Sequence, residues 1–262
     1  MNNTYIRPLR HQWLLPLRYL RHRLIPRATY AADREDVAVQ CLLSSVERFI
    51  DVGANDGFAC SNSFLFAVNG TRGICFEPEP SNFARLSSLL RFKRRVRCIS
   101  QGLSDREWTV QMSSDGLLSS IDSTDDPGLA DLLDEHRTSD AALVEASVSC
   151  LAKWLEQFFE FVGRDFISID VEGHELHVLE GIDWQCTPKP ARCLAIETHA
   201  VGVEKSWRHR DFDQIQALLD ARGYVRVAAS ANNTFWLHRE DVDDVRLREA
   251  RRRLPGYIWE PT

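Results

Sequence analysis

The sequence predicts an α/β fold in which a mostly parallel sheet carries helices on both faces. Short apolar runs alternate with segments of helical periodicity from residue 33 onward, which is the pattern of repeated β-α units. The apolar runs are typical of buried strands, because they are short and bounded by turn-forming residues. A chain of 262 residues with 44% hydrophobic residues can bury a sizeable core, so one domain with additions is expected.

In the first half of the body, helices and strands follow one another with short turns between them. The first helix is amphipathic, with Val37, Cys41, Leu42 and Val46 on one face. The elements expected there are, in order, a helix at 33–46, a strand at 49–52, a helix ending near residue 66, a strand at 73–77, a helix at 81–92 capped by Ser81, and a strand at 96–100.

In the second half, an exposed strand at 108–112 is followed by a long segment rich in Ser, Asp and Gly. This segment, residues 113–140, is the longest predicted loop. The elements expected after it are a strand at 147–150, a helix at 151–159, a strand at 165–170, a helix at 174–180, a strand at 193–197, a helix at 212–219, two strands at 224–228 and 234–238 with a hairpin turn at 232–233, and a charged helix at 241–253.

The chain divides into a basic N-terminal extension at 1–32, a catalytic domain at 33–240 and a helical tail at 241–262. Six of the 32 basic residues lie in residues 1–27, whereas all 38 acidic residues lie after them. An acidic body argues against nucleic acid as a partner. The arginines and apolar residues of 1–27 suit either contact with an anionic membrane surface or packing on the body or a partner protein. A transit peptide is less favoured, since no Ser is present there.

The cysteines and the hydropathy pattern favour a cytoplasmic location, with peripheral membrane contact through 1–27 as the alternative. The seven cysteines are scattered and contain no C-x-x-C pair, which excludes a zinc ribbon and fits a reducing compartment. No uncharged apolar run approaches the ~20 residues that a membrane span needs.

A glycine-rich turn follows the first strand, with the sequence DVGANDG at 51–57. Gly53 and Gly57 leave space above the strand end for a ligand, and Gly57 also allows the following helix to pack close to the strand. Glu77 ends the next strand, where a carboxylate can bind both hydroxyls of a ribose. Asn55 replaces the middle glycine of the dinucleotide fingerprint, which argues against a nicotinamide oxidoreductase. A ribose site without a pyrophosphate cradle indicates S-adenosylmethionine, with Asp51 placed for its ammonium group.

A second polar segment, IDVEGHE at 169–175, follows another core strand. Asp170 is expected at the same sheet edge as the glycine-rich turn. Glu172 and Glu175 lie near a helix N-terminus, so capping is the alternative interpretation for them.

Together these segments resemble the FkbM-type family of S-adenosylmethionine-dependent methyltransferases, over about residues 36–240. The matching segments are DVGANDG at 51–57, FEP at 76–78, IDVEGHE at 169–175, IETH at 196–199 and NNTFW at 232–236. The resemblance implies a class I methyltransferase (Rossmann-like) fold, with seven strands and the last one antiparallel. It also implies methyl transfer, typically to hydroxyls of sugars or natural products, and a cofactor site that includes Asp51, Gly53, Asn55, Gly57, Glu77 and Asp170.

Transfer to a hydroxyl calls for a general base or a metal ion. The candidate bases are Asp170, His174, Glu197 and His199, and the two histidines are preferred. Asp170, Glu172, Glu197 and His199 could instead bind a divalent ion, although no metal-ligand spacing supports such a site.

The acceptor is expected to be a small molecule or a glycan, bound by residues 113–140 and 199–211. Oxygen or nitrogen as the methylated atom, and the oligomeric state, stay open. A non-catalytic, cofactor-binding scaffold is the alternative to an enzyme.

Overall fold

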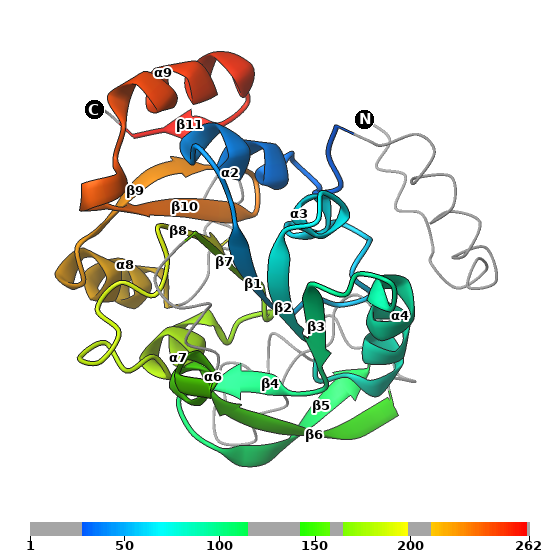
Figure 1. Ribbon diagram of the computed structural model, residues 1–262. Coiled ribbons are helices and arrows are strands. Elements are labelled where there is room, and N and C mark those ends of the chain that lie inside the picture. Colours follow the sequence, from blue (N-terminus) through cyan, green and yellow to red (C-terminus); the bar gives the residue numbers. More distant parts are fainter. Residues whose placement is uncertain (1–27, 115–141, 158–164, 199–210, 261–262) are drawn as a thin grey trace, which may run out of the picture.

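The computed structural model describes residues 28–114, 142–157, 165–198 and 211–260 (Figure 1). Its main sheet has eight strands in the order β11-β9-β10-β8-β7-β1-β2-β3. The strands are β1 (Arg48–Val52), β2 (Arg72–Phe76), β3 (Val96–Ile99), β7 (Phe166–Ile169), β8 (Cys193–Glu197), β9 (Tyr224–Ala229), β10 (Asn233–His238) and β11 (Ile258–Trp259).

Most of this sheet is parallel, as the β-α alternation predicts. Strands β1, β2, β3, β7 and β8 pair in parallel, whereas β10 is antiparallel to both of its neighbours. The seven expected strands are present, and β11 adds an eighth at one edge through antiparallel pairing with β9.

Helices cover both faces of the sheet. One apolar cluster is formed with α2 (Glu35–Leu42), α3 (Phe64–Val68), α4 (Pro80–Leu90) and α9 (Asp244–Arg253), and we call this side of the sheet the α2 face. The other cluster is formed with α6 (Leu151–Gln157), α7 (Glu175–Glu180) and α8 (Phe212–Ala221). Because strand side chains alternate between faces, Phe49 and Asp51 of β1 project to the α2 face and Ile50 and Val52 to the other.

A second, three-stranded sheet in the order β4-β6-β5 is the main feature that the sequence did not predict as a unit. Strand β4 (Gly102–Ser104) is parallel to β6 (Ala142–Cys150), and β5 (Trp108–Ser114) is antiparallel to it. Val110, Met112, Ala146 and Val148 form a small core on this sheet. Strand β6 begins five residues before the predicted strand, and most of the predicted loop at 113–140 lies outside the described residues.

The start of α4 differs from the prediction that Ser81 caps it. Glu79 is the N-cap, its carboxylate accepts a hydrogen bond from the Asn82 amide at 2.6 Å, and Pro80 occupies the first turn. Ser81 lies inside the helix, where its hydroxyl donates to Glu79 at 2.6 Å. Proline is well suited to the first helical turn because it needs no amide hydrogen there, and its position therefore moves the helix start upstream.

The C-terminal segment packs on the body. Leu247 and Ala250 of α9 are buried in the cluster with α2, and β11 extends the main sheet. Arg226 of β9 forms an ion pair with Glu260 at 2.6 Å. Among the described helices, none combines the length and apolar character needed to cross a bilayer.

Candidate active site

The carboxyl ends of the parallel strands bring the predicted polar residues to one edge of the sheet. In the register, Asp51 of β1 lies opposite Ser168 of β7 and Cys75 of β2. Glu77, Asp170 and Glu197 stand at or just after the ends of β2, β7 and β8. Parallel strands end at the same edge, and the crevice outside that edge is where open α/β sheets bind ligands.

The turn after β1 fits closely against the end of β7. The amides of Gly53 and Ala54 both donate to the Phe76 carbonyl, at 3.0 and 2.9 Å. Gly53 has φ +84°, and a Cβ atom there would lie 1.7 Å from the Asp170 carbonyl oxygen. Only glycine fits this position, because any side chain would meet backbone. Asn55 also has a positive φ, +50°, and its side chain accepts from the Asp56 amide at 2.7 Å.

Gly57 serves a different contact from the one expected. The sequence suggested that it lets the following helix pack close to the strand. In the structure a Cβ atom on Gly57 would lie 2.5 Å from Leu86 Cδ1 of α4, so the close neighbour is the next helix along the chain instead of α3. The space beside Gly57 is therefore filled by side chains of α4.

Glu77 is held against the glycine-rich turn. Its carboxylate accepts hydrogen bonds from the backbone amides of Asn55 and Glu79, each at 2.8 Å. The side chain is 4% exposed, and burial raises its pKa from 4.5 to about 7, although the two amides act in the opposite direction. Each carboxylate oxygen can accept more than one hydrogen bond, so both retain acceptor capacity for a ligand hydroxyl.

Asp51 lies beneath the turn, and the Ser63 hydroxyl donates to it at 2.5 Å. Burial raises its pKa from 3.8 to about 7, the Ser63 hydrogen bond lowers it, and the Asp170 charge raises it further. Beside it, the Asn62 amide group donates to the Ser168 hydroxyl at 3.1 Å. Ser63 and Asn62 carry no motif that would have singled them out in the sequence.

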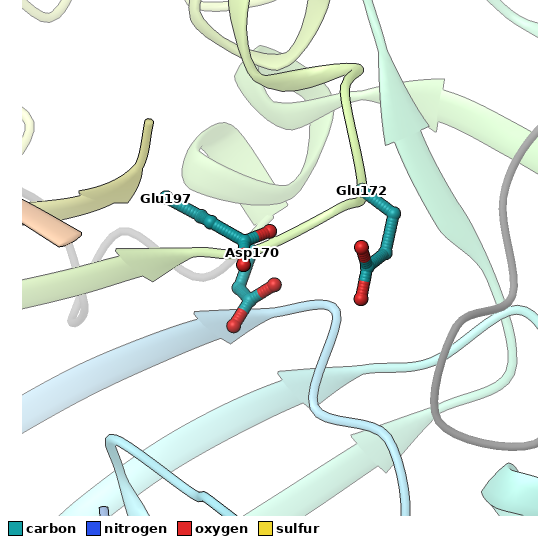
Figure 2. A group of neighbouring side chains, drawn as sticks. All are labelled: Asp170, Glu172 and Glu197. Atoms are coloured by element: carbon teal, nitrogen blue, oxygen red, sulfur yellow. The ribbon is translucent and has the colours of Figure 1, made fainter. Parts of the chain in front are cut away.

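Asp170, Glu172 and Glu197 form a group of three carboxylates, which we call the carboxylate group. One oxygen from each side chain lies within 4.8 Å of the others, and Figure 2 shows the three carboxyl groups turned toward a shared space. Asp170 and Glu197 share a side-chain hydrogen bond. Burial is the largest cause that raises the pKa of each carboxyl, and for Glu172 and Glu197 the neighbouring acidic charges raise it further.

Glu175 lies in the first turn of α7, but its carboxylate binds the turn that precedes the helix; the N-cap is His174, which makes no side-chain cap hydrogen bond. Its Oε1 accepts from the amides of Val171 and Gly173, at 3.0 and 3.2 Å. These contacts hold the turn in which Glu172 takes φ +53°. Glu175 therefore positions the loop that presents Glu172.

The two histidines preferred as bases have different outcomes. His174 directs Nε2 to the Ser104 hydroxyl at 2.9 Å and stacks on His177 with ring centroids 4.3 Å apart. Burial and the neighbouring His177 lower its pKa from 6.5 to about 4. These contacts connect His174 to β4 of the smaller sheet. His199 lies outside the described residues.

A polar cluster from distant parts of the chain was missed in the sequence. Glu35, at the start of α2, accepts from the Ser230 hydroxyl at 2.8 Å and from Asn233 Nδ2 at 3.4 Å. Glu35 is 1% exposed, and its charge raises the pKa of Asp170. Asn233 lies directly opposite Glu197 in the β8–β10 register. A separation of 198 residues between Asn233 and Glu35 leaves no local sequence signal.

Comparisons with known proteins identify one family. The family model described as the methyltransferase FkbM domain matches residues 51–226. Among curated proteins, none matches the chain.

Solved structures that resemble the chain include three methyltransferases. The methyltransferase FkbM from Methylobacillus flagellatus is 19% identical, with a TM-score of 0.45, and the match covers 73% of this chain but only 43% of that protein. A putative O-methyltransferase from Klebsiella pneumoniae is 11% identical, with a TM-score of 0.45 and coverage of 86% and 89%. The O-methyltransferase from Bacillus cereus in complex with SAH is 10% identical, with a TM-score of 0.46 and coverage of 85% and 89%.

The strand order of the chain agrees with the family assignment. From β3 to β9 the order is β3-β2-β1-β7-β8-β10-β9 with β10 antiparallel, which is the class I methyltransferase arrangement that the resemblance implied. Since the family model covers well over half of the sequence, the chain belongs to the FkbM methyltransferase domain family.

Proposed function

We propose that this protein is an S-adenosylmethionine-dependent methyltransferase that methylates a hydroxyl of a sugar, a glycan or a natural product. The observation that carries the proposal is the position of Glu77. Its carboxylate is fixed by two backbone amides at the edge of the glycine-rich turn, where it retains capacity to accept ribose hydroxyls.

The residues at the sheet edge suit this cofactor. The end of β7 leaves no room for a side chain at Gly53. The turn therefore presents backbone atoms to a ligand at this position. We assign the ribose to Glu77, the amino-acid part to Asp51 and Asp170, and the walls of the site to Gly53, Asn55 and Gly57. When bound, S-adenosylmethionine supplies an electrophilic methyl group on a positively charged sulfur, and the acidic side chains here are complementary to that charge.

The carboxylate group is suited to receive the proton of an acceptor hydroxyl. Its carboxyls have raised pKa values, and a base works best when its pKa lies near the working pH. We therefore favour Asp170, supported by Glu197, over His174, because the Nε2 atom of His174 is directed at Ser104 and burial disfavours its protonated form. Asp170 also directly follows the core strand β7, and its backbone carbonyl lies against Gly53 of the glycine-rich turn.

The proposal includes a cellular location and a class of partner. We propose a cytoplasmic enzyme, since none of the seven cysteines, which all lie in the described residues, forms a disulfide. A small-molecule or glycan acceptor is the expected partner, and contact of residues 1–27 with a membrane surface or a protein stays a separate hypothesis.

The direct experiment follows transfer of a labelled methyl group from S-adenosylmethionine to a panel of sugars, nucleotide sugars and hydroxylated natural products. Transfer to at least one hydroxyl acceptor is expected for the wild type. At saturating S-adenosylmethionine, Asp170→Asn should lower kcat and leave the KM for the acceptor nearly unchanged. The matched control is Glu180→Gln, an exposed change on α7 that should leave the rate unchanged. Transfer to amines alone would refute O-methylation, and undiminished activity of Asp170→Asn would remove Asp170 from its role.

A further inference from the structure

The carboxylate group and Asn233 together offer four oxygen ligands at one edge of the sheet. Asp170, Glu172 and Glu197 each place one carboxylate oxygen within 4.8 Å of the others. Two ligands on opposite sides of a calcium-sized ion, at 2.3–2.6 Å from it, are roughly 4.6–5.2 Å apart. The three oxygens could therefore contact one ion with little movement of the chain.

Asn233 supplies an independent observation. Its side chain is 5% exposed, and its Oδ1 atom has no hydrogen-bond partner in the described part of the chain. Buried amide oxygens are almost always paired, so an orphan calls for an explanation such as a missing donor or ion. Its Nδ2 atom already donates to Glu35 at 3.4 Å, so Oδ1 is the atom of the side-chain amide that is available to a ligand.

The sheet register places Asn233 beside Glu197, one member of the carboxylate group. Asn233 of β10 lies directly opposite Glu197 of β8. Directly opposed residues on antiparallel strands project from the same face, with Cβ atoms about 4.5–5.5 Å apart. Asn233 and Glu197 therefore both project to the α2 face, like the opposed pair Phe235 and Ala195 two positions along the same strands.

The charges around Glu172 also favour a cation. Within the described residues, the charges that act on Glu172 are those of Asp170 and Glu175, and both are acidic. Glu175 is already engaged with the turn amides at 171 and 173. A fixed loop thus presents Glu172 at the group, and no basic side chain of the described segments neutralises it.

We propose that Asp170, Glu172, Glu197 and Asn233 bind one hard divalent cation, such as Mg²⁺, Mn²⁺ or Ca²⁺. Carboxylate and amide oxygens are the ligands such ions prefer, and four protein ligands leave coordination positions for water or for an acceptor hydroxyl. The role of the ion rests on the proposed function. When bound, the ion would make an acceptor hydroxyl more acidic, and the Asp170 oxygen that does not contact the ion would receive the proton.

The test measures Mn²⁺ binding to the full chain by electron paramagnetic resonance and titration calorimetry. One Mn²⁺ per chain is expected, displaced by excess Mg²⁺ or Ca²⁺. Loss of an outer-shell partner alone weakens metal binding by ~10–100-fold, so Glu172→Gln, which loses a direct ligand, should weaken it at least tenfold. Asn233→Ala should bind with an affinity between those of the wild type and Glu172→Gln. Glu180→Gln on the exposed side of α7 is the matched control and should bind like the wild type.

Two results would overturn the proposal. The first is absence of stoichiometric Mn²⁺ binding by the wild type, or equal binding by Glu172→Gln. The second is displacement of Mn²⁺ by saturating S-adenosylhomocysteine, which would assign the carboxylates to the cofactor alone. The same preparations are titrated with S-adenosylhomocysteine without metal. Cofactor binding without Mn²⁺ binding rejects the cation site only, whereas Mn²⁺ binding without cofactor binding rejects the methyltransferase proposal and leaves the cation site standing.

Discussion

Replacement of Gly53 by alanine tests the close contact between the turn after β1 and the end of β7. The new Cβ would lie 1.7 Å from the Asp170 carbonyl oxygen, so one of the two backbone segments must move. A left-handed conformation costs a non-glycine residue about 1–2 kcal/mol. Overpacking adds about 1–3 kcal/mol. We therefore expect Gly53→Ala to lower the free energy of unfolding by roughly 2–5 kcal/mol.

A second glycine isolates the contribution of the contact. Gly70 has nearly the same φ, +83°, but nothing lies within 4 Å of the position that its Cβ would occupy. Gly70→Ala therefore has the backbone cost without the clash. The two variants should differ by about 1–3 kcal/mol, or roughly 2–12 °C in Tm, with Gly53→Ala the less stable. Urea and thermal unfolding measure both, and equal stability of the two variants would refute the close approach of Gly53 to Asp170.

Three further changes test other parts of the structure. Glu79→Ala removes the N-cap bond to Asn82, so it should cost about 0.5–2 kcal/mol and speed hydrogen exchange in the first turn of α4; unchanged exchange would contradict the cap. Gly57→Ala should destabilise less than Gly53→Ala, because it meets the flexible end of Leu86, and a double-mutant cycle with Leu86→Ala should show favourable coupling. The pKa of Asp51 is raised in the folded state, so its contribution to stability is lost as pH rises through about 7. Between about pH 4 and 7, Asp51 should therefore lower the free energy of unfolding of the wild type by up to about 1.4 kcal/mol for each pH unit of increase. Asp51→Asn should lack this contribution in urea unfolding; an unchanged dependence on pH would contradict a raised pKa.

The parallel core of the fold could be predicted because its signal is local. Buried parallel strands are short apolar runs, and the run at 193–197 coincides with β8. The same holds for the turn after β1, where glycine and asparagine were expected at a tight turn and take positive φ. The position of Glu77 beside the turn followed from the end of its strand.

The remaining features depend on contacts between distant segments. Glu35 reaches Asn233 across 198 residues, and the polar residues at the start of α2 carry no pattern that announces this contact. Strands β4 and β11 are only three and two residues long. Such short segments have no sequence pattern of their own, so they become strands only through pairing with their neighbours. His174 was a candidate base because it belongs to the polar segment at 169–175. Its contacts with Ser104 and His177 depend on how the smaller sheet packs against α7.

Titration calorimetry with S-adenosylhomocysteine tests the central claim most directly. The wild type is expected to bind one molecule per chain. Glu77→Gln should bind about 10- to 100-fold more weakly, because a hydrogen bond to a charged group contributes about 1.5–3 kcal/mol. Glu180→Gln should bind like the wild type. No binding by the folded wild type, or equal affinity of Glu77→Gln, would contradict the assignment of this sheet edge to S-adenosylmethionine.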